Sequence, residues 1–256
     1  MKEEAHEIEK PAKLPAGLCL ALSDELQALA LIHRREASDT LLDYLRDAGF
    51  PQNMSLKLDS DDARTGAELL GGAILDLSSP LSPGESDELA ADYAAIYLNH
   101  GYQASPYESV WLTEEHLTQQ EPMFQVRQQY RTYGLAVPDW RIIPDDHISF
   151  QLEFISRVLA LKPDPPINVA AEFMDQHLLR WVGEFGARIS VRCATPFYAG
   201  AALLTAAYCD TLRDILAAPL CTARPAPEEI EKRDKESGEA EPRIPLVYIP
   251  GTEPSW

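Results

Sequence analysis

The sequence predicts an all-α protein, built as a single helical-bundle domain with disordered or extended N- and C-terminal segments. Three observations predict this fold class. Apolar residues recur at helical spacing, helix start and stop signals separate the apolar segments, and no convincing period-two run indicates a strand. We therefore expect a flexible lead over residues 1–20, the helical domain over residues 21–220, and an acidic, proline-rich tail over residues 221–256.

The first helix is expected to begin at Ser23, a residue type that caps helix N-termini, and to end at Gly49-Phe50-Pro51. His33 falls on the apolar stripe of this helix. That position predicts a core histidine hydrogen-bonded to a backbone carbonyl. A second helix is expected from about residue 59 to 77, where Gly71-Gly72 indicates the close approach of another helix.

The centre of the chain carries the clearest helix signals. Ser82-Pro83-Gly84-Glu85 combines a capping serine, a proline in the first turn and a glutamate three residues on. A further helix is expected to begin at Pro122 and to be capped by Gly134. Another is expected to open at Pro144-Asp145-Asp146, where carboxylates meet the positive end of the helix dipole.

Two more helices are expected, from about Asn168 and from Thr195-Pro196 to Pro219. The first of them places four large side chains at successive turns, namely Phe173, His177, Trp181 and Phe185. In the tail, residues 244–250 and Trp256 form an apolar patch in an otherwise polar segment. We expect this patch to dock onto the body or onto a partner, the alternative being that it has no role.

The formal charge of −19, from 41 acidic and 22 basic residues, narrows the class of partner. Nucleic acids and anionic membrane surfaces need cations to neutralise them, so neither is expected as a partner, whereas a basic partner is compatible. The N-terminus lacks the apolar core of a signal peptide, and no apolar run approaches the roughly 18 residues of a membrane helix. We expect a cytoplasmic protein without stable membrane insertion.

The sequence gives little indication of catalysis. Its four cysteines form no CxxC pair, so reduced thiols are expected in place of a zinc site or a disulfide framework. Zinc-protease, phosphate-loop, dinucleotide and nucleophile-elbow motifs are absent. The prediction is therefore a protein that is not an enzyme and carries no cofactor.

One constellation offers an alternative function, a metal-dependent hydrolase built on Asp145, Asp146, His147 and His177. Asp and His are metal-ligand types. However, adjacent residues on a helix point about 100° apart, which hinders Asp146 and His147 from sharing one ion with His177. The competing interpretation is structural: Asp146 caps its helix, and His147 hydrogen-bonds a neighbouring loop.

The stretch from Tyr93 to His147 has the composition of a peptide-binding groove. Its aromatic and apolar residues flank a loop rich in Pro and Gly in an acidic protein, and they are Tyr93, Ile96, Tyr97, Tyr107, Trp111, Tyr130 and Trp140. The alternative is that these side chains only form the core.

Five motifs of the chain, over roughly residues 23–217, resemble the TorD/DmsD-type redox-enzyme maturation chaperones, which are related to the nitrate reductase assembly chaperones. The motifs are a helix end with Tyr93, Ile96 and Tyr97; a loop with Pro106, Tyr107, Ser109, Val110 and Trp111; Arg127, Tyr130 and Gly134; Pro144, Asp146 and His147; and Phe173, His177, Leu178 and Trp181. The loop has Tyr107-Glu108 where a relative has Trp-Gly, and the C-terminal extension is unfamiliar.

The resemblance implies an all-helical chaperone that binds the twin-arginine leader of a molybdopterin-dependent oxidoreductase subunit and delays export until the cofactor is inserted. It associates Tyr93, Ile96, Tyr97, Asp146 and His147 with leader binding. The chaperone is expected as a monomer or a helix-swapped dimer.

The chemistry of a leader agrees with this function, since two arginines precede an apolar segment. Our hypothesis is that the groove is lined by Tyr93, Tyr97 and Trp111, and that Glu108 and Asp146 contribute charge to bind guanidinium groups. The full predicted binding set is Tyr93, Ile96, Tyr97, Pro106, Tyr107, Glu108, Trp111, Arg127, Tyr130, Asp146 and His147.

Overall fold

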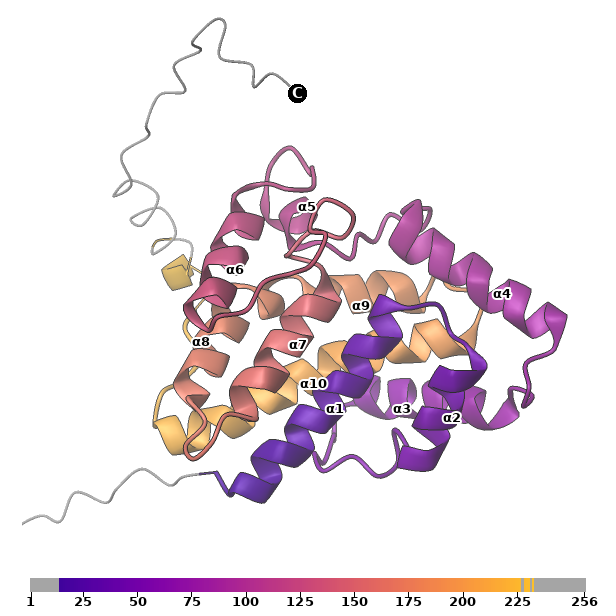
Figure 1. Cartoon of the computed structure of the whole chain (residues 1–256), viewed down its shortest axis with the longest axis horizontal. Helices are drawn as coiled ribbons and strands as arrows, with labels where there is room; N and C mark the ends of the chain where they lie inside the picture. Colours follow the sequence, from indigo (N-terminus) through magenta and orange to yellow (C-terminus); the bar gives the residue numbers. More distant parts are fainter. Residues whose placement is uncertain (1–13, 227, 231, 233–256) are drawn as a thin grey trace, which may run out of the picture. The chain divides into compact units, whose positions relative to one another are not determined.

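The computed structural model describes residues 14–226, 228–230 and 232, and it confirms the predicted all-α fold (Figure 1). Its described residues contain no strand, only one isolated β-bridge. In chain order the elements are α1 (Ala16–Arg34), α2 (Asp39–Ala48), α3 (Asp61–Asp76), α4 (Pro83–Tyr93), the π-helix η1 (Ala94–Leu98), α5 (Glu108–Leu112), α6 (Glu121–Thr132), α7 (Ile148–Leu159), α8 (Ile167–Gln176), the 3₁₀ helix η2 (Leu178–Arg180), α9 (Val182–Ser190) and α10 (Pro196–Leu220).

The chain divides into two compact units, residues 1–224 and residues 225–256. In the second unit, residues 228–230 are helical, and the N–H of Glu229 donates to the carbonyl of Ala226 at 2.9 Å. The predicted apolar patch at residues 244–250 and Trp256 lies outside the described residues, as does the first part of the predicted lead.

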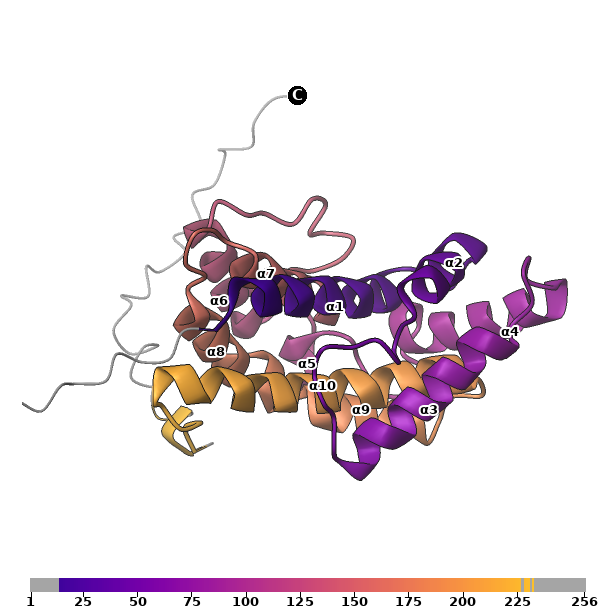
Figure 2. The same cartoon turned by 90° about the horizontal axis from the view of Figure 1, so that it is seen from below.

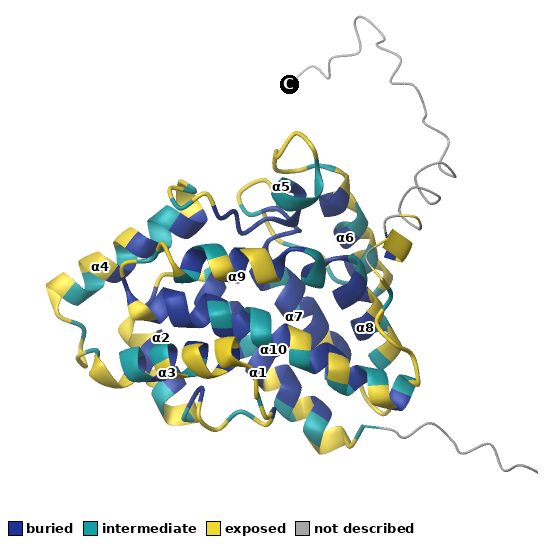
Figure 3. Ribbon diagram, turned by 180° about the vertical axis from the view of Figure 1, so that it is seen from behind, coloured by how far each residue is buried: buried dark blue, intermediate teal, exposed yellow. Residues whose placement is uncertain are grey.

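The helical unit is organised around two long helices, α1 and α10. α1 packs along α7, whereas α10 packs against α3 and α9, so that α1 and α10 lie in different layers (Figure 2). Buried residues are frequent along α7 and α10, while α4 is mostly exposed or half-buried and buries only Leu89 and Asp92 (Figure 3). The core thus lies between the two layers.

The crossing of α3 and α10 depends on two glycines that face each other. A Cβ atom on Gly66 would lie 2.7 Å from the backbone nitrogen of Leu204, and one on Gly200 would overlap the backbone of Leu70. The predicted close helix approach therefore exists on α3, but not at the predicted Gly71-Gly72 pair. Gly71 instead faces the side chain of Gln52, and Gly72 has open space beside it.

The first predicted helix starts too late and is in fact two helices, although its predicted end at Gly49 is confirmed. α1 starts at Ala16, inside the predicted flexible lead, and Ser23 is buried within it, where its hydroxyl lies 2.9 Å from that of Ser156. The apolar stripe already includes Leu18, Cys19 and Leu22, N-terminal of Ser23, so the helix begins directly after Pro15 and not at the serine. Arg35 is extended, and a separate helix α2 follows, ended by Gly49 at φ +62°.

Two later helices also differ from the prediction. α7 begins at Ile148, so Asp145 and Asp146 precede it and do not form its first turn. The helix expected to carry His177 and Trp181 breaks at His177, whose backbone has φ −123° and ψ −85°. The break separates α8 from α9 and turns His177 towards a buried carboxylate described below.

The other predicted helix signals are confirmed. Ser82 and Glu85 form a reciprocal capping box at the start of α4. Gly134 follows α6 with φ +68°, the left-handed conformation that favours glycine after a helix.

One described helix, α1, is long and apolar enough to span a membrane by length and composition alone. In this structure half of its residues are buried, and Leu22, Leu26, Leu29 and Ile32 belong to the core with no exposed surface.

Candidate functional site

Two loop segments form the centre of the predicted site. We name residues 104–109 and 144–149 the paired loops, because their backbones run antiparallel through a bridge between Tyr107 and His147. The N–H of Ile148 donates to the carbonyl of Pro106 at 2.8 Å, and the N–H of Glu108 donates to the carbonyl of Asp146 at 3.2 Å. The sequence motifs around Pro106 and Asp146, separate in the chain, are thus one structural feature.

Asp146 holds the paired loops together from inside the protein. Its carboxylate has no exposed surface, and Oδ2 accepts a hydrogen bond of 2.8 Å from the N–H of Ser109. The other oxygen, Oδ1, has no hydrogen-bond partner among the described residues. Burial raises the pKa of the carboxyl to about 6, and the nearby Glu108 acts in the same direction.

His147, not Asp146, caps α7. Its Nδ1 accepts from the N–H of Ser149 at 3.2 Å, while its ring lies 5.2 Å from that of Tyr107 and 6.0 Å from that of Tyr97. Burial lowers the pKa of His147 well below its usual value, so the imidazole is neutral at pH 7. The expected structural roles of Asp146 and His147 are therefore exchanged: the histidine caps the helix, and the aspartate bonds across to a loop.

Glu108 is the second buried carboxylate of the paired loops. One oxygen lies 2.8 Å from Nδ1 of His177, and the other accepts from the side-chain amide of Gln151 at 2.5 Å. Its exposed fraction is 0%. The break after α8 is what brings His177 to this carboxylate. Neither Glu108 nor Asp146 has exposed surface in this structure. Their predicted contact with guanidinium groups of a leader stays a prediction.

The predicted aromatic helix end lies mostly in the core. Ile96 and Tyr97 are buried, whereas Tyr93 is half-buried and its hydroxyl donates to the carbonyl of Arg34 at 2.8 Å. These residues belong to the end of α4 and to η1, a π-helix, which is a local irregularity that often occurs at functional sites. Only Tyr93 of the three has an appreciable accessible surface.

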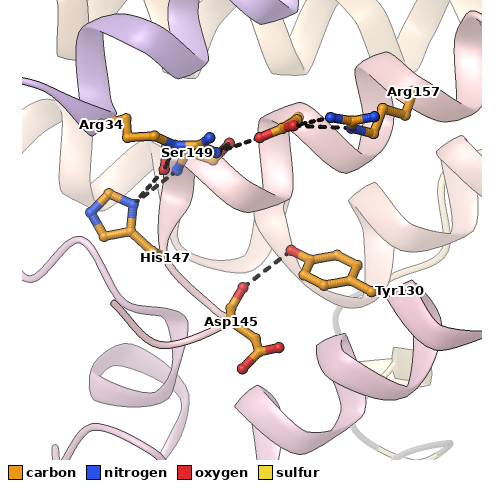
Figure 4. A network of polar contacts seen from close by, with 7 residues as sticks. Arg34, Tyr130, Asp145, His147, Ser149 and Arg157 are labelled. Carbon is orange, nitrogen blue, oxygen red and sulfur yellow. Dashed lines mark hydrogen bonds and ion pairs between the residues drawn. The ribbon is translucent and has the colours of Figure 1, made fainter. Parts of the chain in front are cut away.

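Arg127 is engaged within the protein. Its guanidinium donates through Nε and Nη2 to Oδ2 of Asp145, at 3.1 and 2.8 Å, and lies 4.2 Å from the ring centre of Trp140. The hydroxyl of Tyr130 donates to the carbonyl of Asp145 at 3.2 Å (Figure 4). The predicted residues Arg127 and Tyr130 therefore fix the segment that leads into the paired loops.

Of the predicted binding residues, Trp111 is the one that lines the largest of the three pockets described in this structure. Its ring stacks on Trp181 at 6.2 Å with an interplanar angle of 26°, and its Nε1–H donates to the carbonyl of Ser105 at 2.8 Å. The pocket beside it has a volume of about 760 Å³. Its lining is His100, Gln103, Ser105, Val110, Trp111, His116, Leu117, Thr118, Glu184 and Arg188.

A second pocket, of about 390 Å³, lies beside α7, around Arg34 and Tyr130. Arg34 donates to Glu153 at 2.5 Å and lies 4.3 Å from the ring centre of Phe150; Glu153 also accepts from Arg157 (Figure 4). The sequence analysis did not place Arg34 and Phe150 at the site, because only folding brings Arg34 of α1 against α7.

The four residues of the hydrolase alternative have separate partners. Asp145 pairs with Arg127, Asp146 with the N–H of Ser109, His147 with Ser149, and His177 with Glu108. In the part of the chain that the structure describes, no group of three or more His, Cys, Asp or Glu side chains is placed to hold a metal ion. The geometry gives this alternative no support.

Comparison with known proteins assigns the family. Residues 61–187, which include all five motifs, match the family described as nitrate reductase delta subunit. The chaperone protein TorD of Vibrio cholerae O395 is 30% identical over 131 residues, 47% of this chain and 59% of the relative. TorD of Psychrobacter sp. PRwf-1 is 30% identical over 126 residues, 46% and 57% of the two chains.

TorD of Vibrio vulnificus YJ016 is 29% identical over 140 residues, which cover 50% of this chain and 64% of the relative. The chain thus spans about three fifths of the length of the curated relatives it matches. These matches agree with the resemblance that the five motifs indicate. The chain belongs to the TorD and nitrate reductase assembly chaperone family.

Proposed function

We propose that this chain is a cytoplasmic, system-specific chaperone of a molybdopterin-dependent oxidoreductase. It binds the twin-arginine leader, the apo catalytic subunit, or both, and assists cofactor insertion before export. It acts as a monomer or a helix-swapped dimer. The observation that carries the proposal is the pocket of about 760 Å³ beside Trp111, at the edge of the paired loops.

This pocket suits an apolar peptide segment. Its volume falls in the range of about 300–1,000 Å³ that ligand sites occupy. Val110, Trp111 and Leu117 supply apolar surface, and Leu117 is 57% exposed although it is a large apolar residue. An exposed aliphatic side chain beside a half-buried tryptophan is a surface that anchors peptides in grooves.

In this proposal the buried predicted residues position the pocket and do not contact the ligand. Asp146 holds the N–H of Ser109, and Glu108 ties the start of α5 to α7 and to His177. Because Trp111 follows on the same short helix, these bonds fix its direction. The charges that attract a basic leader then come from exposed carboxylates of the −19 chain.

Co-expression with a molybdenum oxidoreductase encoded beside this protein tests the proposed function. The molybdenum cofactor content of the purified client is measured with the wild type, with Trp111→Ala/Leu117→Ala, and without this protein. We expect the wild type to raise the cofactor content and the double variant to lose most of that gain.

Leu75→Ala is the matched control, because Leu75 is 75% exposed and lies outside all three pockets described in this structure. It should behave as the wild type. A client that is loaded equally well without this protein would contradict the proposed function.

A further inference from the structure

A third pocket has a composition unlike the other two. This acidic groove, of about 390 Å³, lies between α3, α4 and the start of α10, and shares no lining residue with the other two pockets. Its apolar surface comes from Leu69, Ala73, Leu77, Leu89 and Phe197. Leu89 and Phe197 are each 1% exposed and form its floor.

Four carboxylates line the acidic groove, and none of its lining residues is basic; they are Glu68, Asp76, Glu85 and Glu88. Both other pockets contain arginines that pair with their glutamates. Glu85 is occupied by Ser78 and Ser82, as part of the α4 capping box. Within the described part of the chain, the other three form no ion pair or side-chain hydrogen bond.

The spacing of these carboxylates concentrates negative charge on the facing sides of two helices. On α3, Glu68, Gly72 and Asp76 follow at intervals of four residues, so they lie on one face. On α4, Glu85 and Glu88 are three residues apart and are also neighbours. Like charges at such spacing repel one another, and a cationic ligand removes the repulsion.

Gly72 leaves open space on the α3 side of the groove. It lies in the middle of α3, where glycine is less favourable than alanine, and a Cβ atom built there would meet nothing within 4 Å. Helix packing therefore does not require this glycine. Its position between Glu68 and Asp76 allows a ligand side chain to approach the helix backbone closely.

We propose that the acidic groove binds the arginine pair and the first apolar residues of a twin-arginine leader. This inference rests on the proposed function and adds the place where the cations bind. The guanidinium groups pair with Glu68, Asp76 and Glu88, and the apolar residues that follow cover Leu69 and Leu77. Charge complementarity selects this occupant, since an apolar groove lined by four carboxylates disfavours neutral or anionic peptides.

The test uses the full-length chain and calorimetric titration with a twin-arginine leader peptide. The groove variant is Glu68→Gln/Asp76→Asn/Glu88→Gln, which leaves the capping Glu85 intact. The control variant is Asp47→Asn/Glu172→Gln/Asp214→Asn, which changes the net charge equally at exposed positions outside the three pockets. We expect about tenfold weaker binding for the groove variant and less than about twofold for the control.

A second variant tests the shape of the groove without removing charge. Gly72→Phe should fill the space on the α3 side of the groove and weaken leader binding, whereas Gly17→Phe, at an exposed glycine with equally open surroundings on α1, should not. A leader whose two arginines are replaced by glutamine should bind the wild type and the groove triple variant equally.

The outcomes separate this inference from the proposed function. If the wild type binds the leader and both groove variants bind it as tightly, the groove is not the cation site. Equal losses in the groove and control triples would show that only total charge matters, which also overturns the inference. If the wild-type protein binds no leader, both this inference and the leader-binding part of the proposed function are wrong, whereas the assistance with cofactor insertion is tested separately by co-expression.

Discussion

The hydroxyl of Tyr97 lies 2.6 Å from Nδ1 of His33. Nε2 of the same ring lies 2.8 Å from the hydroxyl of Thr205, which donates its own proton to the carbonyl of Ala201. Nε2 therefore carries the proton and Nδ1 accepts from Tyr97, which agrees with the lowering of the pKa of His33 to about 3 by burial. One neutral histidine thus joins η1, α1 and α10.

This arrangement gives Tyr97 a structural role that a deletion of its hydroxyl will reveal. Tyr97→Phe leaves Nδ1 of His33 buried without a donor, which costs about 1–3 kcal/mol of unfolding free energy. Urea unfolding measures the loss. Tyr44→Phe is the control, because Tyr44 is 42% exposed, and it should change stability by less than about 0.5 kcal/mol. Equal stability of the two variants would contradict the role assigned to Tyr97.

The buried Asp146 carboxyl predicts a specific pH dependence of stability. Its pKa is raised from 3.8 to about 6, so between these values the folded protein holds the proton more strongly than the unfolded chain. Its contribution is therefore fully present below about pH 4 and is lost as the pH rises through about 6. Asp146→Asn removes this dependence, because asparagine does not ionise.

Relative to the wild type, Asp146→Asn should therefore gain about 2–3 kcal/mol of unfolding free energy between about pH 4 and about pH 7. Chemical unfolding at several pH values measures the difference, in which the titration of the other carboxyls cancels. Asp47→Asn, at an exposed aspartate, should show no comparable trend. A difference that stays constant with pH would rule out the raised pKa.

The contact between Gly66 and Gly200 predicts a strong asymmetry among glycine substitutions. Gly200→Ala forces a Cβ atom into the backbone of α3, so the two helices must separate, at a cost of roughly 1–3 kcal/mol. Gly72→Ala, in the same helix pair, meets open space and should stabilise the protein by up to about 1 kcal/mol. Thermal unfolding of both variants measures the two signs. A stabilised Gly200→Ala would contradict the close crossing.

The helical architecture could be predicted because most of its signals are local. The capping box at Ser82, the glycine stop at Gly134 and the apolar periodicity depend on neighbours in the sequence, and the structure contains each of them. The misplaced start at Ser23 has a local cause as well. A serine inside a long helix can bond another helix, as Ser23 does with Ser156, so its residue type alone does not mark a helix start.

The details of the site could not be predicted because they depend on contacts between distant segments. His33 was correctly expected in the core, but its partners are the hydroxyls of Tyr97 and Thr205 and not a backbone carbonyl. The exchange of roles between Asp146 and His147 follows from the pairing of two loops that are far apart in the sequence. The break at His177 likewise depends on a carboxylate supplied by Glu108.

The most direct measurement of the central claim is calorimetric titration of the wild-type protein with a twin-arginine leader, from a molybdenum oxidoreductase encoded beside it, at low and moderate salt. We predict saturable binding that weakens as salt is raised, because exposed carboxylates supply the attraction. A double-lysine leader should bind more weakly, since lysine lacks the two-pronged geometry of arginine. Absence of binding at both salt concentrations would contradict leader recognition by this chain.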